Sequence, residues 1–326
     1  MSATPALIPA ATQFAERLAD WSRKAQGAFA DNTERALRAD SAVFSTWCAV
    51  TGRSTLPAAP ETVVAFLRAQ AEAGNAIATL RRRASTIARM HRAAGLPNPC
   101  DAEGVRLALR ALARSKGTQQ KQAVPLVRRD ADRIADRVLA DGARLKDRRD
   151  VALMLIGRDL LTRASELVSL AREDVEFTAD GGALVSLRRY KTSTEARLYK
   201  VGPDAAAALK AWLAGSGIAS GPVFRSITRG GMVTDRALSV RDVGRILKAL
   251  GGRAKLDPML AARLSGHSLR VGMAIDLVAA SVPSTAILQA AGWTTPRMLA
   301  RYTERLETDR GAIAQYYRLG SDGPAR

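Results

Sequence analysis

A polar stretch about a third of the way along the chain limits most strongly how the chain can fold. Residues 115–122 carry no hydrophobic side chain, and Pro125 follows them closely. Such a segment has no face that a core could bury, so it predicts a connection between two bodies. The 326 residues are enough for two domains, each with its own core. We therefore expect a domain boundary here.

Both sides of this boundary are basic. The chain has 50 Lys and Arg against 31 Asp and Glu, and its net charge of +19 divides into +8 before residue 123 and +11 after it. This excess indicates a polyanionic partner and argues against an ordinary metabolic enzyme. Most of the basic residues are arginines, which suit bidentate contacts to phosphate and guanine, although a GC-rich genome would give the same bias. The even division predicts two lobes that close around one polyanion.

The few cysteines and histidines exclude several classes of protein. Cys48 and Cys100 are the two cysteines, and His91 and His267 are the two histidines. They cannot supply the ligand set of a zinc finger, and they do not form a disulfide framework, which fits a reducing compartment. The uncharged start of the chain lacks the basic region of a signal peptide, and no run approaches the ~20 apolar residues that span a bilayer. We therefore expect a cytoplasmic protein without a membrane partner.

The first lobe has the pattern of a helical domain. Asn32 and Thr33 can cap a helix that runs towards Trp47, and Pro60 begins another. Apolar residues recur at helical spacing over 76–94, and Gly95 ends that helix. Arg81, Arg82 and Arg83 stand together on its basic surface, which we expect to contact DNA, although a solvated charged face is the alternative.

The second lobe is predicted to combine helices with a small sheet. Residues 151–156 are an unbroken apolar run that suggests a buried segment. A Gly-Gly turn signal precedes a predicted strand over 183–187, and the return strand covers 197–201 with a hairpin tip at 191–194. We expect the rest to be helical, up to a short segment over 312–319.

One set of spaced residues carries chemistry. If Ser268 lies in the first turn of a helix, His267 and Arg270 share a face, because they are three residues apart. Further along the chain Gly292-Trp293-Thr294 precedes Tyr302. Earlier in the chain Arg163 stands three residues before Glu166.

These motifs, in this order, resemble the tyrosine recombinases, the phage integrase family. Trp47-Cys48, Met90-His91-Arg92, Gly95-Leu96-Pro97 and Lys121-Gln122-Ala123 extend the resemblance over nearly the whole chain. It implies a mainly α protein with a small antiparallel β-sheet, in which the domains form a C-shaped clamp on DNA. The domains are a flexible arm over 1–14, an all-α core-binding, SAM-like domain over 15–114, a linker over 115–125 and an α+β catalytic domain over 126–326.

The resemblance also implies the roles of the site residues. Tyr302 would attack a backbone phosphorus and form a 3′-phosphotyrosyl bond. Arg163 and Arg270 would hold the nonbridging oxygens in the transition state. His267 would hydrogen-bond the phosphate or accept the tyrosine proton. Trp293, at a position where many members have a second histidine, could donate from its indole but could not exchange protons.

Two further side chains complete this expected site. Lys191 would be the general acid for the departing 5′ oxygen, with Lys200 as a rival because hairpin registers are hard to place from sequence. Glu166 would orient His267 or an arginine. We expect no cofactor, no metal and no ATP, because the phosphotyrosine stores the energy of the broken bond.

The expected partners are double-stranded DNA, which implies association with the nucleoid, and three further copies of the chain. Arg241, on a helix that begins near Leu238, matches an arginine of the family that recognises guanine. The other candidate DNA contacts are Arg81, Arg82, Arg83, Lys121, Arg225 and Arg229. A terminal helix over about 310–319 would dock into a neighbouring protomer, with Tyr316 and Tyr317 as anchors, and close a tetramer.

Other functions stay open at this stage. A type IB topoisomerase or a resolvase would use the same tyrosine chemistry on other substrates. A recombinase-derived protein would bind DNA without cleaving it, and a general basic DNA-binding protein would need none of the site residues. The presence of the complete set favours a site-specific recombinase that integrates, excises or resolves DNA at inverted-repeat targets.

Overall fold

The computed structural model describes residues 10–117, 122–140, 142–188 and 196–309. The chain divides into two compact units, Met1–Lys121 and Gln122–Arg326. The division falls inside the expected linker over 115–125. The last helix of the first unit continues to Lys116, inside the range expected for the linker, and the second unit begins at Gln122.

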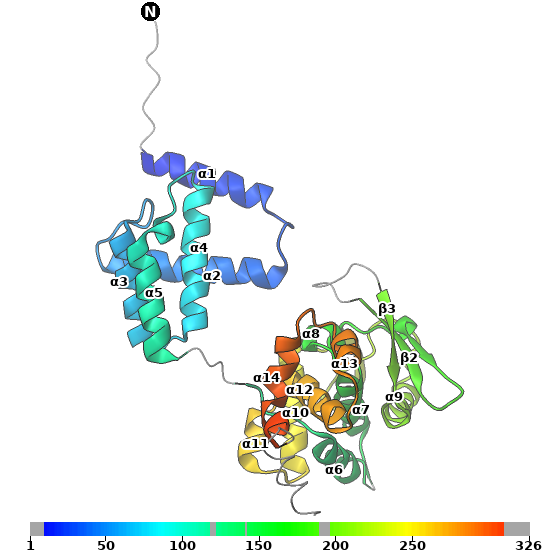
Figure 1. The fold of residues 1–326 in the computed structure, drawn as a ribbon. Helices are drawn as coiled ribbons and strands as arrows, with labels where there is room; N and C mark the ends of the chain where they lie inside the picture. The colour runs from blue at the N-terminus through cyan, green and yellow to red at the C-terminus, as the bar shows by residue number, and fades with distance from the viewer. Residues whose placement is uncertain (1–9, 118–121, 141, 189–195, 310–326) are drawn as a thin grey trace, which may run out of the picture. The chain divides into compact units, whose positions relative to one another are not determined.

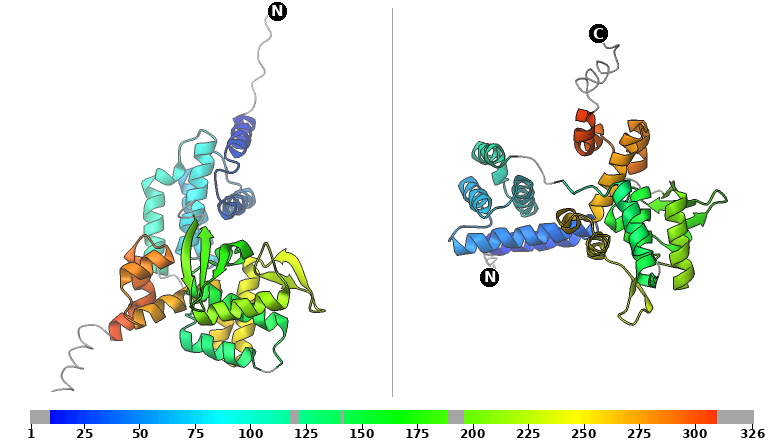
Figure 2. Two further views of the ribbon diagram at one scale, coloured as in Figure 1. Left: turned by 90° about the vertical axis from the view of Figure 1, so that its right-hand side faces the viewer. Right: turned by 90° about the horizontal axis from the view of Figure 1, so that it is seen from below.

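In the first unit the described residues form helices and no strand, as expected (Figure 1). The elements are α1 (Ala10–Lys24), α2 (Asp31–Val50), α3 (Pro60–Glu72), α4 (Ile77–Ala93), the 3-10 turn η1 (Pro99–Asp101) and α5 (Glu103–Lys116). Seen nearly along their axes in the right-hand view of Figure 2, α3, α4 and α5 pack side by side and α2 crosses them.

An aromatic cluster closes the core of this unit. Phe44 and Phe66 are fully buried, and their ring centroids lie 5.0 Å apart in an edge-to-face arrangement. Trp47 packs on Phe66 from the same side of α2, at 5.4 Å. These rings bury large apolar surfaces and prefer this geometry, so they hold α2 against α3.

The start of this unit differs from the sequence prediction. Helix α1 begins at Ala10, whereas a flexible arm was expected up to residue 14. Phe14, Leu18 and Trp21 stand four and three residues apart and are each half-buried, so this segment has an apolar stripe that stabilises a helix. Helix α2 begins at Asp31, and no side chain caps its first turn, contrary to the role expected of Asn32 and Thr33.

The second unit combines helices with two small antiparallel sheets, which confirms the expected fold class. Its helices are α6 (Arg128–Val138), α7 (Leu145–Asp159), α8 (Ala164–Val168), α9 (Pro203–Ser216), α10 (Val240–Arg253), α11 (Pro258–Arg263), α12 (Gly266–Ala279), α13 (Ser284–Ala291) and α14 (Pro296–Asp309), with the 3-10 turn η2 (Arg172–Asp174). Its strands are β1 (Val175–Phe177), β2 (Ala183–Arg188), β3 (Ala196–Val201), β4 (Arg225–Ile227) and β5 (Val233–Ala237).

The first sheet has the order β1-β2-β3, and Val185 on the central strand pairs with Val175 and Tyr199. It confirms the strand and return strand expected from the sequence. The second sheet is the hairpin β4-β5, in a region that was expected to be helical. Gly230 and Gly231 form its turn between segments with β-branched residues, a pattern that favours a hairpin over a helix.

Helix α7 lies in the middle of the second unit, with α6, α9 and α12 packed against it (Figures 1 and 2). Its apolar run buries Val151, Leu153 and Ile156 completely, as the sequence suggested. On α9 the buried Trp212 donates its indole N–H to the carbonyl of Val223 at 2.9 Å, which satisfies its one polar atom. None of the described helices combines the length and apolar character needed to cross a membrane.

Candidate active site

Five of the expected site residues come together from four parts of the second unit. Arg163 immediately precedes α8, His267 and Arg270 lie on α12, Trp293 follows α13 and Tyr302 lies on α14. Ser268 lies in the first turn of α12, so His267 and Arg270 share a face as expected. Helices α12 and α14 pack side by side, which brings the residues of the two helices together.

The geometry centres on a bond between His267 and Tyr302. His267 Nε2 lies 2.8 Å from the phenol oxygen Oη of Tyr302. The two rings meet edge to face, with centroids 5.7 Å apart. This is the distance at which a proton can pass from the phenol to the imidazole.

Arg270 is buried close to this pair. The residue is only 2% exposed, and its guanidinium carbon lies 5.1 Å from the ring centroid of Trp293. Its Nη2 donates to the carbonyl of Ala291 at the carboxyl end of α13, where the helix dipole favours a cation. Trp293 in turn lies 5.4 Å from the Tyr302 ring, so one indole contacts both the arginine and the tyrosine.

Arg163 is held by Glu166. The carboxylate accepts the backbone N–H of Arg163 at 2.8 Å and its Nη1 at 2.6 Å. The first of these bonds satisfies a donor at the start of α8, which is why an acidic residue three positions on is favoured there. Glu166 is buried while the Arg163 side chain is about one-third exposed, so the guanidinium is fixed and still accessible. The expected partner of Glu166 was either His267 or an arginine, and in the structure it is the arginine, Arg163.

The environment sets the protonation of the reacting pair. Burial lowers the pKa of His267, and the positive charges of Arg270 and Arg163 lower it further. Burial raises the pKa of Tyr302, and the charges of Arg270 and Arg301 partly offset that rise. Near neutral pH the imidazole is therefore neutral and the phenol is protonated, so the phenol can donate and the imidazole can accept.

The candidate general acid Lys191 lies outside the described residues. Its rival Lys200 is placed: it forms an ion pair with Asp180 and donates to the hydroxyl of Thr178 at 3.2 Å. In the sheet Lys200 stands opposite Leu184, at the end of the hairpin remote from its tip. The bond from Lys200 lowers the pKa of Asp180, and the lysine is engaged away from the hairpin tip.

Among the candidate DNA contacts in the second unit, the structure separates two exposed arginines from one engaged arginine. Arg241 is exposed in the first turn of α10, and Arg229 is exposed at the turn of the β4-β5 hairpin. Arg225 has a side chain only 14% exposed, and all three of its guanidinium nitrogens donate within the protein. Their acceptors are Asp235 and the carbonyls of Pro222 and Ser220. Arg225 is therefore engaged within the protein, unlike the two exposed arginines.

The three arginines on α4 also differ. Arg81 is exposed, and Arg82 is about half-exposed in an ion pair of 2.8 Å with Asp40. Arg83 has a side chain 13% exposed, which donates to Gln70 and lies 3.6 Å from Asp40. The buried carboxylate of Asp40 thus holds α2 against α4, and Arg83 serves that contact. Lys121, the last of the candidates, lies outside the described residues.

Sequence reasoning missed two groups that orient arginines. Asp40 orients Arg82 and Arg83 on α4. The carbonyl of Ala291 orients Arg270 in the candidate site. Asp40 is one of many acidic residues with no distinctive neighbour in the sequence. The Ala291 carbonyl has a weak signal, because Gly292 follows it with φ +61° and ends α13 in the left-handed conformation that favours glycine.

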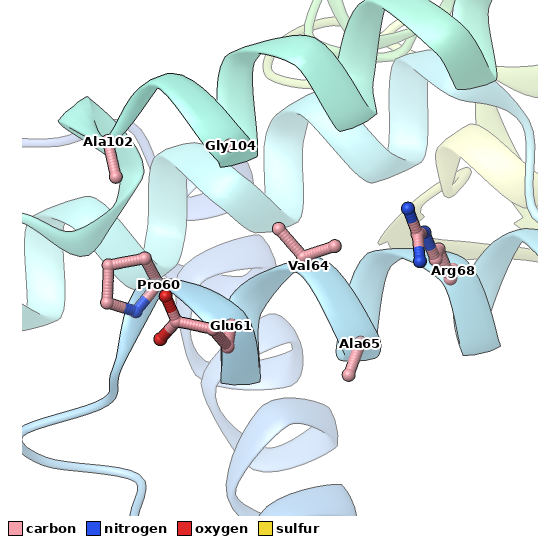
Figure 3. Close-up of a pocket in the computed structure, with 7 residues that line it drawn as sticks. All are labelled: Pro60, Glu61, Val64, Ala65, Arg68, Ala102 and Gly104. Atoms are coloured by element: carbon pink, nitrogen blue, oxygen red, sulfur yellow. The ribbon is translucent and has the colours of Figure 1, made fainter.

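The first unit contains a hollow of about 400 Å³ (Figure 3). It separates the first turns of α3 and α5, and Val64 points from α3 towards Gly104, which has no side chain to fill the space. Glu61 and Arg68 are its charged lining residues. Within the described parts of both units, no group of three or more His, Cys, Asp or Glu side chains has the arrangement of a metal site.

Comparison with known proteins adds sequence relatives that cover both units. The model of the phage integrase family matches residues 126–308. An integrase/recombinase XerD homolog of Selenomonas ruminantium is 34% identical over 294 residues, which cover 87% of this chain and 84% of that protein. The recombinase Cre of Escherichia phage P1 is 29% identical over 336 residues, which cover 98% of this chain and 96% of Cre. The motifs from Trp47-Cys48 to Gly292-Trp293-Thr294 predict a likeness to Cre over nearly the whole chain, and the match to Cre has that extent.

Solved structures share the fold at lower identity. The Tn1549 transposon integrase in complex with transposon right end DNA has a TM-score of 0.64 at 14% identity, over 93% of this chain and 99% of that one. A lambda integrase dimer bound to a COC′ core site has a TM-score of 0.56 at 15% identity, over 88% of this chain and 76% of that one.

Proposed function

The chain belongs to the phage integrase family of tyrosine recombinases, site-specific enzymes that cleave and rejoin DNA strands, and from this premise we propose how its side chains divide the work. The observation that carries the proposal is the 2.8 Å contact between His267 Nε2 and Tyr302 Oη beside two fixed arginines.

Tyr302 is the nucleophile in this proposal. Its Oη attacks the phosphorus of a backbone phosphodiester, the bond from phosphorus to the 5′ oxygen breaks, and a 3′-phosphotyrosyl bond remains. Because burial raises the pKa of the phenol, the proton must leave as the new bond forms. His267 takes it, since its neutral Nε2 faces the phenol and its lowered pKa keeps it unprotonated. Attack by a free 5′ hydroxyl reverses the steps and rejoins the strand.

The two arginines stabilise the charge that develops on the phosphate. Arg163 and Arg270 are held by Glu166 and by the Ala291 carbonyl before any substrate arrives. Prearranged donors of this kind need little reorganisation in the transition state, which is the main source of electrostatic catalysis. Trp293 stacks near both Arg270 and Tyr302 and supplies an indole N–H to a nonbridging oxygen.

The general acid in the proposal is Lys191, as the family resemblance implies. The 5′ oxygen leaves poorly as an alkoxide, so proton donation contributes roughly 10²–10⁴-fold. The engagement of Lys200 with Asp180 supports this choice between the two lysines.

The same proposal includes double-stranded DNA as the substrate, enclosed by the two basic units. Arg241 and Arg229 are exposed and serve as DNA contacts in the second unit, and Arg81 serves in the first. The resemblance also implies a synapse of four protomers on inverted-repeat targets, closed by a helix over about 310–319, which lies outside the described residues. The enzyme then acts in the cytoplasm, on the DNA of the nucleoid.

A nicked suicide substrate that carries the target site tests the chemistry. The target is found first by sequencing DNA bound to the Tyr302→Phe protein. Wild-type protein should form a covalent protein–DNA adduct in EDTA, and Tyr302→Phe should form none while it still binds the half-site. Tyr199→Phe, which removes a hydroxyl from β3, is the matched control and should form the adduct.

An adduct in the Tyr302→Phe protein would refute the assigned nucleophile. No adduct with wild-type protein at its own target would refute the cleavage reaction itself. Relaxation of supercoiled DNA that has no target would favour a topoisomerase.

A further inference from the structure

The segment with which the second unit begins lies along the helices that carry the reacting pair. We call residues 122–128 the strap. The backbone N–H of Leu126 donates to the carbonyl of Ser268 at 3.0 Å, and the side-chain amide of Gln122 donates to the carbonyl of Arg301 at 2.7 Å. Ser268 directly follows His267, and Arg301 directly precedes Tyr302. The strap therefore bonds to the chain neighbours of both partners in the site's central hydrogen bond.

Buried groups anchor one end of the strap. Leu126 is fully buried, and its carbonyl accepts from Nη1 of Arg158. The Nη2 of the same arginine donates to Asp276 Oδ2 at 2.6 Å, and this oxygen also accepts the backbone N–H of Arg128 at 2.8 Å. Both the backbone before α6 and the last turn of α12 are thus tied to one buried guanidinium.

Helix α12 accommodates this anchor because of a glycine. A Cβ at Gly272 would lie 1.9 Å from the carbonyl oxygen of Leu126 and 2.3 Å from its carbonyl carbon. Both are backbone atoms, which cannot rotate away as a flexible side chain could. The direct contact of strap and helix therefore depends on the absence of a side chain at this position.

The anchored end limits where the other end can lie. An extended chain advances at most about 3.6 Å per residue, so the four steps from Leu126 to Gln122 span at most about 14 Å. Within this distance of Leu126, the side chain of Gln122 bonds to the turn of α14 that carries Tyr302. Arg301 lies inside α14, so the bond acts on the helix itself rather than on a loop.

We propose that Gln122 is a positioning residue for strand cleavage: its amide holds the turn of α14 at the place where the Tyr302 phenol meets His267. This inference rests on the proposed function of that pair. Gln122 does not contact the reacting atoms, and it acts through the carbonyl of Arg301. A small displacement of a nucleophile is costly, because reaction depends on near-attack geometry.

The test measures the rate of a single cleavage on a suicide substrate, with protein in saturating excess. Gln122→Ala and Gln122→Glu both remove the donor, and the second keeps the length of the side chain. Each should slow cleavage on the order of 10-fold, with half-site binding and Tm unchanged. Gln122→Lys restores a donor and should return the rate to within about 2-fold of wild type. Gln289→Ala, at an exposed glutamine on α13, is the matched control and should cleave at the wild-type rate.

The results separate the two proposals. If wild-type protein forms no adduct, the proposed function fails, and a role of Gln122 in cleavage fails with it. If wild-type protein cleaves and the Ala and Glu variants cleave equally fast, Gln122 has no positioning role. Failure of the Lys variant to recover, at unchanged Tm, would equally refute an effect that depends on the donated bond.

Discussion

The two histidines, one in each unit, show how differently one side chain can be used. His91 on α4 is 0% exposed, and both of its ring nitrogens bond to backbone: Nε2 accepts from the N–H of Ala58 at 2.9 Å, and Nδ1 donates to the carbonyl of Ile87 at 2.8 Å. His267 on α12 uses Nε2 to contact the phenol of Tyr302, a group that can give up a proton.

The pKa does not distinguish them. Burial lowers the pKa of His91, partly offset by the bond to Ile87, and burial also lowers the pKa of His267, helped by Arg270 and Arg163. What differs is the partner: backbone groups cannot exchange a proton with an imidazole near neutral pH, whereas a tyrosine can. The partners of an imidazole thus indicate catalysis better than the direction of its pKa shift.

The largest effect expected from this comparison is on the rate of cleavage. His267→Ala removes the proton acceptor and should lower the single-turnover rate of adduct formation by roughly 10²–10⁴-fold. Tm should change little, because this side chain faces the site rather than a core. A variant that cleaves within a few fold of wild type would show that the phenol proton leaves by another route.

The second effect should appear in stability and not in chemistry. His91→Ala leaves a cavity and removes the partners of the Ala58 N–H and the Ile87 carbonyl. We expect the free energy of unfolding to fall by about 2–4 kcal/mol, measured by urea denaturation of the full chain. Cleavage by the folded protein at saturating concentration should stay within about 2-fold. A stable variant that cleaves poorly would reverse the contrast between the two histidines.

The smallest effects are those of pH, one on the free energy of unfolding and one on the rate of cleavage. The folded pKa of His91 lies below its unfolded value of about 6.5, so the unfolded chain binds more protons and stability falls as pH falls below about 6.5, by up to about 1.4 kcal/mol per pH unit. The cleavage rate should rise with pH through the lowered pKa of His267 and be level from pH 7 to 8.

Denaturation and single-turnover cleavage over one series of buffers measure both. His91→Ala should weaken the first dependence, to which the lowered pKa of His267 still contributes, and keep the second. A cleavage rate that still rises steeply above pH 7 would contradict a neutral His267 as the acceptor.

The resemblance singled out residues that are far apart in the sequence and that the fold of the second unit brings together. The set that it named and the structure brings together is Arg163, His267, Arg270, Trp293 and Tyr302. The partner of Glu166 stayed open between His267 and an arginine, since a carboxylate at a helix start can turn to either side. Its bonds to Arg163 needed the fold.

The arginines were harder to assign from sequence. A charge in a basic segment says nothing about its exposure, so Arg83 and Arg225 were chosen as DNA contacts although each is engaged within the protein. The β4-β5 hairpin was not predicted from the sequence, because its strands are short and carry charged residues. The contact of Gln122 has no local signal at all, because its partner lies 179 residues further along the chain.

The strap has a consequence for how the length of this chain can change. Leu126 and Gln122 are each bonded to a fixed point, so an insertion between them would shift one bond or the other out of register. Residues added ahead of position 122 would leave both bonds as they are. Relatives with longer or shorter connections, and fusions that place a different first unit on this second unit, should therefore vary in length before Gln122 and keep the spacing that follows it.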